Sequence, residues 1–108
     1  MNNVKIYNKL VRDKIPEIID VDVNKCDFDM VDGKRIFQLL QNKLQEEVNE
    51  FFANDNVEEL VDIMEVVFAT AEILGVSEEE LGKIREEKKD RCGGFKQGIL
   101  LKSVKKRW

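Results

Sequence analysis

Two pairs of acidic residues near the middle of the chain are the side chains best suited to chemistry. They are Glu47/Glu50 and Glu59/Asp62, and the members of each pair are three residues apart. On an α-helix this spacing places both side chains on one face, about one turn from each other. The polar segment 53–56 between the pairs predicts a turn, and two helices that meet there as an antiparallel hairpin would bring all four carboxylates together. Such a cluster is unfavourable without a cation among the acids, so the pattern predicts a metal site.

The remaining composition narrows the kind of metal and the kind of reaction. The chain has no histidine and only two isolated cysteines, which excludes the common zinc sites and histidine-based catalysis. Carboxylate oxygens alone favour Mg²⁺, with Mn²⁺ as the alternative, and Mg²⁺ usually shares its coordination shell with substrate phosphates. Neither GxxxxGK[ST] nor GxGxxG occurs. These features predict direct hydrolysis of a nucleoside triphosphate or a similar pyrophosphate ester by water.

The individual acids differ in their expected surroundings. Glu47 falls on the apolar stripe of a helix expected at residues 34–52, where an unpaired acid is expensive. Glu46 and Glu50 lie on the flanking faces. Asp62 stands between Val61 and Ile63 and is expected to be the most enclosed acid of the protein. The structural alternative for Glu59 is an N-terminal capping role with Asn56, three residues earlier.

The apolar periodicity predicts one all-α domain over residues 1–108, with a central antiparallel helix hairpin. Further helices are expected at residues 57–74, with Gly75 as the stop, and from Ser77 to about residue 92, where Ser77 and Glu80 form a capping box. Pro16 predicts a break or a new helix start. The helix at 57–74 is apolar nearly all round, which indicates the middle of a bundle or a subunit interface. Residues 95–101 are open to two interpretations, a short strand or an ordered tail, and 26–31 could form a short extended segment.

The charges are unevenly distributed along the chain. The net charge is −4, but residues 45–87 carry fourteen acids and two bases, whereas residues 88–108 carry eight bases and one acid. A basic tail is compatible with a phosphate-rich ligand beside an acidic metal site, with nucleic acid, or with a solvated surface. No apolar run approaches the ~20 residues of a membrane span, and no secretory signal is recognisable. With two isolated cysteines, we expect a reducing, cytoplasmic location and no membrane partner.

The motifs resemble those of a known enzyme superfamily. EExxE (Glu46, Glu47, Glu50) followed by ExxD (Glu59, Asp62) resembles the signature of the MazG-like, all-α NTP pyrophosphohydrolases. The opening YNKLVRDKIPEII and the later RCGGF resemble the phosphoribosyl-ATP pyrophosphohydrolase-like branch of that superfamily. The resemblance implies a MazG-like helical bundle that forms a homodimer or homotetramer. It also implies a Mg²⁺-dependent enzyme that converts a nucleoside triphosphate to the monophosphate and pyrophosphate, often to clean the nucleotide pool.

The resemblance also assigns roles to residues of this sequence. It implies Glu47, Glu50, Glu59 and Asp62 as metal ligands. Glu46 would act with Glu47 and Glu50 in catalysis, from outside the metal's own ligands or by orienting water. Substrate contacts would come from the opening and late motifs, through Lys9, Arg12, Asp13, Lys14, Lys88, Arg91, Gly93 and Gly94. Only eight residues separate Glu50 from Glu59, fewer than in many relatives, so a loop insert that reads the base is missing.

Three alternatives remain open at this stage. The substrate could be phosphoribosyl-ATP of histidine biosynthesis, with the same chemistry. The chain could be a helical interaction module without turnover, in which the acids bind no metal. Nucleic-acid binding by the basic tail ranks third and predicts strongly salt-dependent binding.

Overall fold

The computed structural model describes residues 3–20 and 25–106, and every regular element in these ranges is a helix. The helices are α1 (Ile15–Asp20), α2 (Gly33–Asn54), α3 (Val57–Ile73) and α4 (Glu78–Cys92). The prediction of an all-α protein is thus confirmed. Residues 26–31 and 95–101 contain no strand. The last two residues of the basic segment 88–108 lie outside the described ranges.

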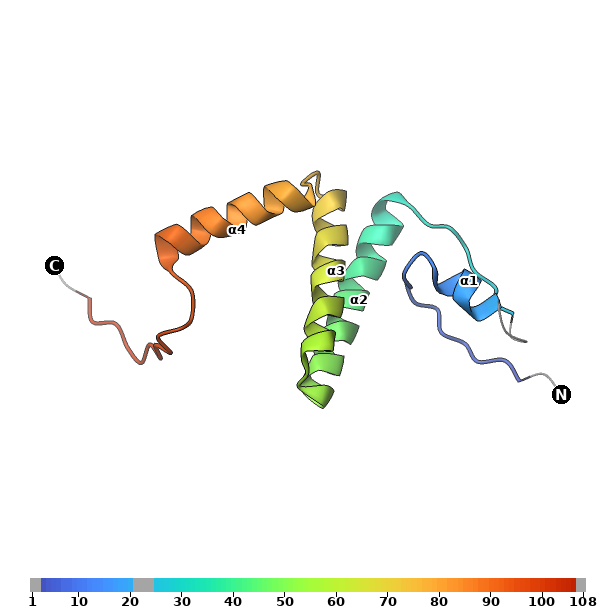
Figure 1. The fold of residues 1–108 in the computed structure, drawn as a ribbon, viewed down its shortest axis with the longest axis horizontal. Helices are drawn as coiled ribbons and strands as arrows, with labels where there is room; N and C mark the ends of the chain where they lie inside the picture. Colours follow the sequence, from blue (N-terminus) through green and yellow to red (C-terminus); the bar gives the residue numbers. More distant parts are fainter. Residues whose placement is uncertain (1–2, 21–24, 107–108) are drawn as a thin grey trace.

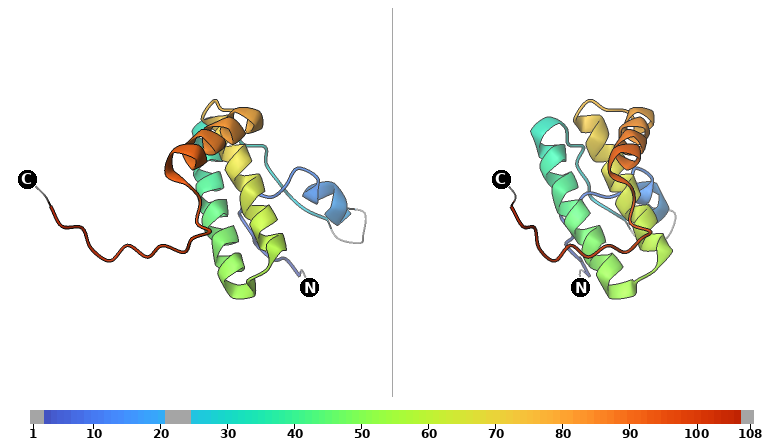
Figure 2. Two further views of the ribbon diagram at one scale, coloured as in Figure 1. Left: turned by 60° about the vertical axis from the view of Figure 1, so that its left-hand side comes forward. Right: turned by 90° about the vertical axis from the view of Figure 1, so that its left-hand side faces the viewer.

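The connection between α2 and α3 is short and sharply turned. Asp55 has a left-handed backbone (φ 51°, ψ 39°), a conformation that Asp tolerates better than most residues, and its N–H donates to the carbonyl of Phe51 at 2.7 Å. Asn56 follows as the N-cap of α3, where its side chain accepts from the N–H of Glu59 at 3.1 Å. This turn reverses the chain, so α2 and α3 lie side by side and run in opposite directions (Figure 1; Figure 2).

The core of a single copy is very small. Among the described residues only Leu40, Val66 and Ala71 are buried apolar side chains. The radius of gyration is 19.3 Å and the longest dimension is 72 Å, whereas a compact chain of this length has a radius of gyration of about 13 Å. One copy of the chain is therefore extended and leaves most of its apolar surface in contact with solvent.

Helix α4 projects away from the hairpin after a tight turn (Figure 1). Gly75 has φ 86°, which favours glycine, and its N–H donates to the carbonyl of Glu72 at 3.0 Å. The predicted capping box is present: the Ser77 hydroxyl accepts from the N–H of Glu80, and the Glu80 carboxylate accepts from the N–H of Ser77. Helix α4 contacts α3 near this turn and buries none of its own residues. No helix in the described ranges combines the length and the apolar character needed to cross a bilayer.

We expect Ser77→Ala to unfold part of α4 without unfolding the hairpin. The substitution removes both hydrogen bonds of the hydroxyl, with the N–H of Glu80 and with its carboxylate, and such caps contribute about 1 kcal/mol. Because α4 has no buried residues, little else compensates for this loss. Circular dichroism should show lower helicity in Ser77→Ala than in the parent. The control Ser103→Ala, outside any helix, should have the helicity of the parent. Equal helicity in both variants would contradict this assignment of the cap.

Candidate metal centre

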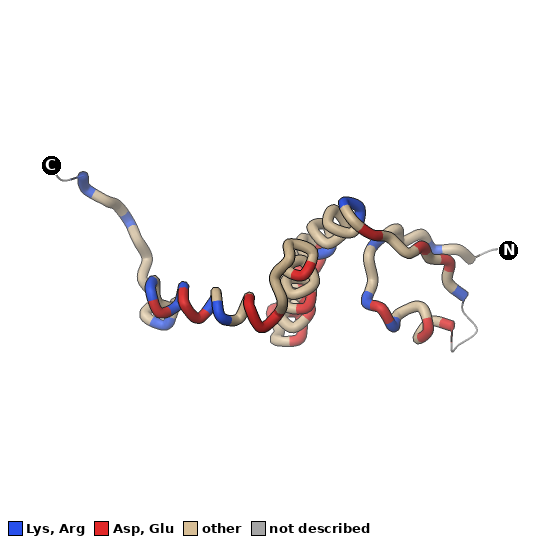
Figure 3. The backbone as a smooth tube through the Cα atoms, turned by 90° about the horizontal axis from the view of Figure 1, so that it is seen from above, with Lys and Arg blue, Asp and Glu red and all other residues tan. Residues whose placement is uncertain are grey.

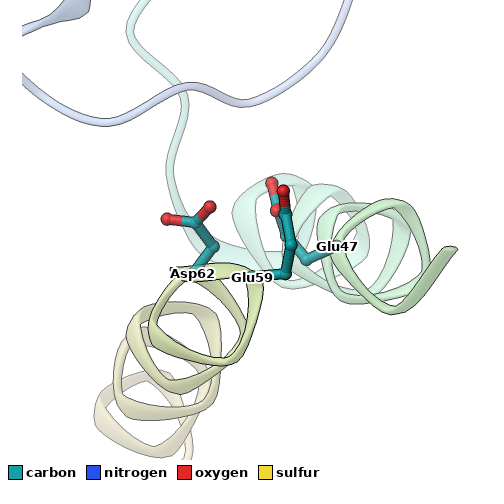
Figure 4. A group of neighbouring side chains, drawn as sticks. All are labelled: Glu47, Glu59 and Asp62. Carbon is teal, nitrogen blue, oxygen red and sulfur yellow. The ribbon is translucent and has the colours of Figure 1, made fainter. Parts of the chain in front are cut away.

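Three of the predicted carboxylates come together at one place on the hairpin. Glu47 projects from α2, and Glu59 and Asp62 project from α3 (Figure 4). One oxygen atom from each of these three residues lies within 4.8 Å of the others. The pairing of Glu47 with Asp62 follows from the turn, because these two positions are at similar distances from it on the two antiparallel helices, and Glu59 lies one turn from Asp62 on the same face of α3. Part of the predicted acidic cluster is therefore present in the fold.

Glu47 is the buried member of this group. It is 9% exposed and is the only buried charged residue among those described. Its Oε1 lies 3.2 Å from Nζ of Lys43, one turn earlier on α2. A carboxylate at such a position needs a compensating charge, and one lysine shared with another acid supplies only part of it.

The expectation that Asp62 is the most enclosed acid is wrong. Its side chain is 42% exposed, much more than that of Glu47. The expectation required that α3 be covered by other parts of the protein on both sides of Asp62. In the structure α3 packs against α2 on one side only, and Val61, next to Asp62, lies on the uncovered side.

Basic side chains of the N-terminal segment lie against the acids of the hairpin. Nη2 of Arg12 is 2.8 Å from Oδ1 of Asp62, and Nζ of Lys9 is 2.6 Å from Oε1 of Glu46. Residues 3–14 contain no helix, so these two ion pairs join a non-helical part of the chain to both helices of the hairpin. Two residues predicted to contact substrate are thus located at the acidic group.

Glu46 is held in its ionised form by two lysines. Burial raises the pKa of its carboxyl group, but hydrogen bonds from Lys9 and Lys43 lower it further than burial raises it, so the net pKa is below the usual value. The same hydrogen bond from Lys9 to Glu46 raises the pKa of Lys9. At neutral pH Glu46 is therefore a negatively charged hydrogen-bond acceptor at the edge of the acidic group.

These shifts predict how stability depends on pH. The folded pKa of Glu46 is lowered, so its contribution is present above the unfolded value of 4.5 and is lost as the pH falls through the folded value. The folded pKa of Lys9 is raised, so its contribution is present below 10.5 and is lost as the pH rises through the folded value. We expect Lys9→Gln to lower the free energy of unfolding by less than about 1 kcal/mol at pH 7, since the pair is partly exposed, and by a smaller amount at pH 3.

Urea unfolding at the two pH values measures this difference, and Lys34→Gln, at an exposed position early in α2, is the matched control. A Lys9→Gln effect that is the same at pH 3 and pH 7 would show that Lys9 contributes through packing and not through its charge.

The remaining predicted residues lie apart from the three carboxylates. Glu50 is exposed on α2 and is not a member of the group, and its role as a metal ligand stays a prediction. Asp13 and Lys14 are exposed in the turn before α1. Lys88 and Arg91 are exposed near the end of α4, and Gly93 and Gly94 follow it. Since α4 leads away from the hairpin, one copy of the chain does not bring these four residues to the acidic group (Figure 1).

Two further polar residues take part in the site and were not identified from the sequence. Lys43 lies 3.2 Å from both Glu46 and Glu47, and its spacing of three and four residues from them on one helix could have indicated this. Asn54 donates to Glu59 at 3.1 Å. Lys43 also lines a cavity of about 50 Å³, which is large enough to hold water. Its lining includes Asn8, Lys9, Leu10, Leu39, Asn42, Lys43 and Glu46.

Comparisons with models of known families, with curated proteins and with solved structures found no match for this chain.

Proposed function

We propose that this chain is a Mg²⁺-dependent nucleotide pyrophosphohydrolase of the MazG-like superfamily. It would hydrolyse a nucleoside triphosphate to the monophosphate and pyrophosphate and so clean the nucleotide pool. The observation that carries the proposal is the group of Glu47, Glu59 and Asp62, in which carboxylates from two helices meet within 4.8 Å. The motifs EExxE and ExxD support the same assignment.

The residues present fit a hard divalent cation. All the donors in the group are carboxylate oxygens, which Mg²⁺ and Mn²⁺ prefer, and no sulfur or nitrogen ligand is among them. The burial of Glu47 favours a cation further, because its charge is only partly balanced by Lys43. When bound, the metal would polarise a phosphoryl oxygen and neutralise charge that develops on it.

The residues around the three carboxylates have separate roles in this proposal. Arg12 and Lys9 bring positive charge to the edge of the acidic group, where the phosphates of a substrate would lie. Glu46, kept ionised by its two lysines, would accept a hydrogen bond from a water molecule and orient it toward phosphorus. The water oxygen would form the new bond to the α-phosphorus and release its protons to solvent as the bond to the pyrophosphate oxygen breaks and pyrophosphate leaves.

We further propose that the chain acts as a homodimer or homotetramer in a reducing cytoplasm. The small core and the large exposed apolar surface of one copy support assembly. Cys26 and Cys92 are both free thiols, in line with a reducing compartment.

The test is pyrophosphate release from a panel of NTPs, dNTPs and phosphoribosyl-ATP, with and without Mg²⁺ or Mn²⁺. Metal-dependent release from an NTP or dNTP is the expected result, and release from phosphoribosyl-ATP alone would instead favour the histidine-pathway alternative. Absence of release from every compound, together with a melting temperature that does not respond to Mg²⁺, would reject the proposal.

A non-catalytic helical interaction module is the second candidate, because many large apolar side chains are exposed. In that case Mg²⁺ would leave the melting temperature unchanged. In the enzyme, metal at 100 times its dissociation constant should add about 2.7 kcal/mol to the stability.

A further inference from the structure

Helix α3 has an uncovered apolar stripe on the side away from α2. We define this α3 stripe by its exposed large apolar residues, Val57, Leu60, Val61, Met64 and Val67. They recur every three or four residues, so they form one continuous face along most of the helix. The opposite face of α3 carries Glu59 and Val66 and packs against α2. The side chains of the α3 stripe are thus exposed to solvent in one copy of the chain.

The segment after α4 combines exposed apolar side chains with positive charge. We call residues 95–106 the C-terminal arm. Five large apolar residues of the arm are each at least 75% exposed: Phe95, Ile99, Leu100, Leu101 and Val104. The arm also carries lysines and, from position 91 onward, the sequence contains no acid. It extends from the far end of α4, away from the hairpin (Figure 1).

The charges beside the α3 stripe favour the C-terminal arm as the segment that covers it, and disfavour the α3 helix of another copy in that place. Helix α3 contains five acids and no base. Three of them, Glu58, Glu65 and Glu72, are seven residues apart and border the stripe on one side. In an antiparallel two-fold pair of α3 helices these borders would meet, and like charges would repel. The arm instead offers apolar side chains with lysines between them. The tube coloured by charge shows acids on the hairpin and bases at the distal end of the chain (Figure 3).

Two observations point to the arm of a second copy. Helix α4 has 15 residues and is about 22 Å long, so it holds the base of the arm at that distance from its own α3. The accessible surface of the chain is 10458 Å², whereas a compact monomer of 12.6 kDa exposes about 6,200 Å². This excess of about 4,000 Å² for one copy is larger than the roughly 1,000–2,500 Å² that each partner buries in an obligate interface, so one copy has enough exposed surface for such an interface.

We infer that the chain forms a two-fold dimer in which the C-terminal arm of each copy lies along the α3 stripe of the other. The apolar residues of the arm cover the stripe, and its lysines pair with the acidic border of α3. This inference goes beyond the proposed activity and does not depend on it, since it concerns the assembly and not the three carboxylates.

The first experiment measures the mass of the full-length protein by sedimentation equilibrium, for the parent and two exposed-residue variants. Met64→Asp places a charge in the α3 stripe, and Ile84→Asp on α4 is the matched control, because both side chains are 53% exposed. The parent should be a dimer. Met64→Asp should weaken dimerisation at least tenfold, and Ile84→Asp less than twofold. A monomeric parent at tens of micromolar, or equal effects of the two variants, would overturn the inference.

The second experiment separates exchange of arms from the other possible contacts. One variant reverses the border of the stripe (Glu65→Lys with Glu72→Lys), and the other reverses the arm (Lys96→Glu with Lys102→Glu). Each alone should be monomeric, and an equimolar mixture should form dimers, because each arm then meets a border of opposite charge on the other copy.

Other contacts predict different results from the same samples. If the arm folded onto its own α3, mixing would restore nothing. If two α3 stripes packed directly together, reversal of the arm alone would leave the dimer intact. Either result would overturn the inference, and because no assay of activity is involved, failure of the proposed function would not obscure it.

Discussion

Replacement of Glu47 by Gln should abolish metal-dependent pyrophosphate release and, without metal, should make the protein more stable. Removal of residues that merely orient metal ligands lowers activity by about 10–100-fold, so loss of a ligand should cost at least about 100-fold. The three carboxylates repel one another within 4.8 Å, and neutralising the buried one relieves this repulsion. The melting temperature of the metal-free variant should therefore rise by a few degrees, as expected for roughly 1 kcal/mol.

Thermal melts with and without Mg²⁺, together with the pyrophosphate assay, measure both effects. Mg²⁺ should stabilise the parent and leave Glu47→Gln unchanged. Glu87→Gln, at an exposed acid of α4 outside the group, is the control and should behave like the parent. If Glu47→Gln released pyrophosphate at the parent rate, the acidic group would not be the active site.

Glu50→Gln distinguishes three metal ligands from the four that the motifs imply. Glu50 is exposed and lies outside the group of three. If Glu50 reaches the metal by rotation of its side chain, its substitution should remove most of the stabilisation by Mg²⁺. If the metal is held by Glu47, Glu59 and Asp62 alone, Glu50→Gln should retain it.

The elements that could be predicted from the sequence are those fixed by local interactions. Asn56 and the Ser77–Glu80 pair cap the helices that follow them, and these contacts involve residues only three apart. Glu47 meets Asp62 because the two are at similar distances from one short turn, and Glu59 joins them from one helical turn away on α3. Both kinds of inference require only helix geometry and the position of a turn.

The features that could not be predicted depend on what lies outside a single helix. The exposure of Asp62 depends on which side of α3 is covered, and among the described helices α2 makes the main contact with α3. The pairing of Lys9 and Arg12 with acids 37 and 50 residues away depends on the path of a non-helical segment. The direction of α4 depends on the backbone at Gly75, a left-handed position that no apolar pattern encodes.

Leu40→Ala should destabilise the fold more than any substitution at the surface. Leu40 is 3% exposed, the lowest value among the buried apolar residues, and truncation of a buried leucine costs about 2–5 kcal/mol. Typical domains have a total stability of only about 5–15 kcal/mol, and just three of the described residues are buried apolar side chains in one copy. A large part of the total stability should therefore be lost, as a lower urea midpoint.

The control for Leu40→Ala is Ile84→Ala, at a half-exposed position on α4, which should change the stability by less than about 0.5 kcal/mol. Both must be compared with the parent at one protein concentration, because assembly adds to apparent stability. Well below the midpoint, pyrophosphate release per folded molecule should stay near the parent value, since Leu40 is not among the acidic or basic residues of the site. Equal urea midpoints for the two variants would mean that the hairpin is stabilised mainly by contacts between copies and not by the core around Leu40.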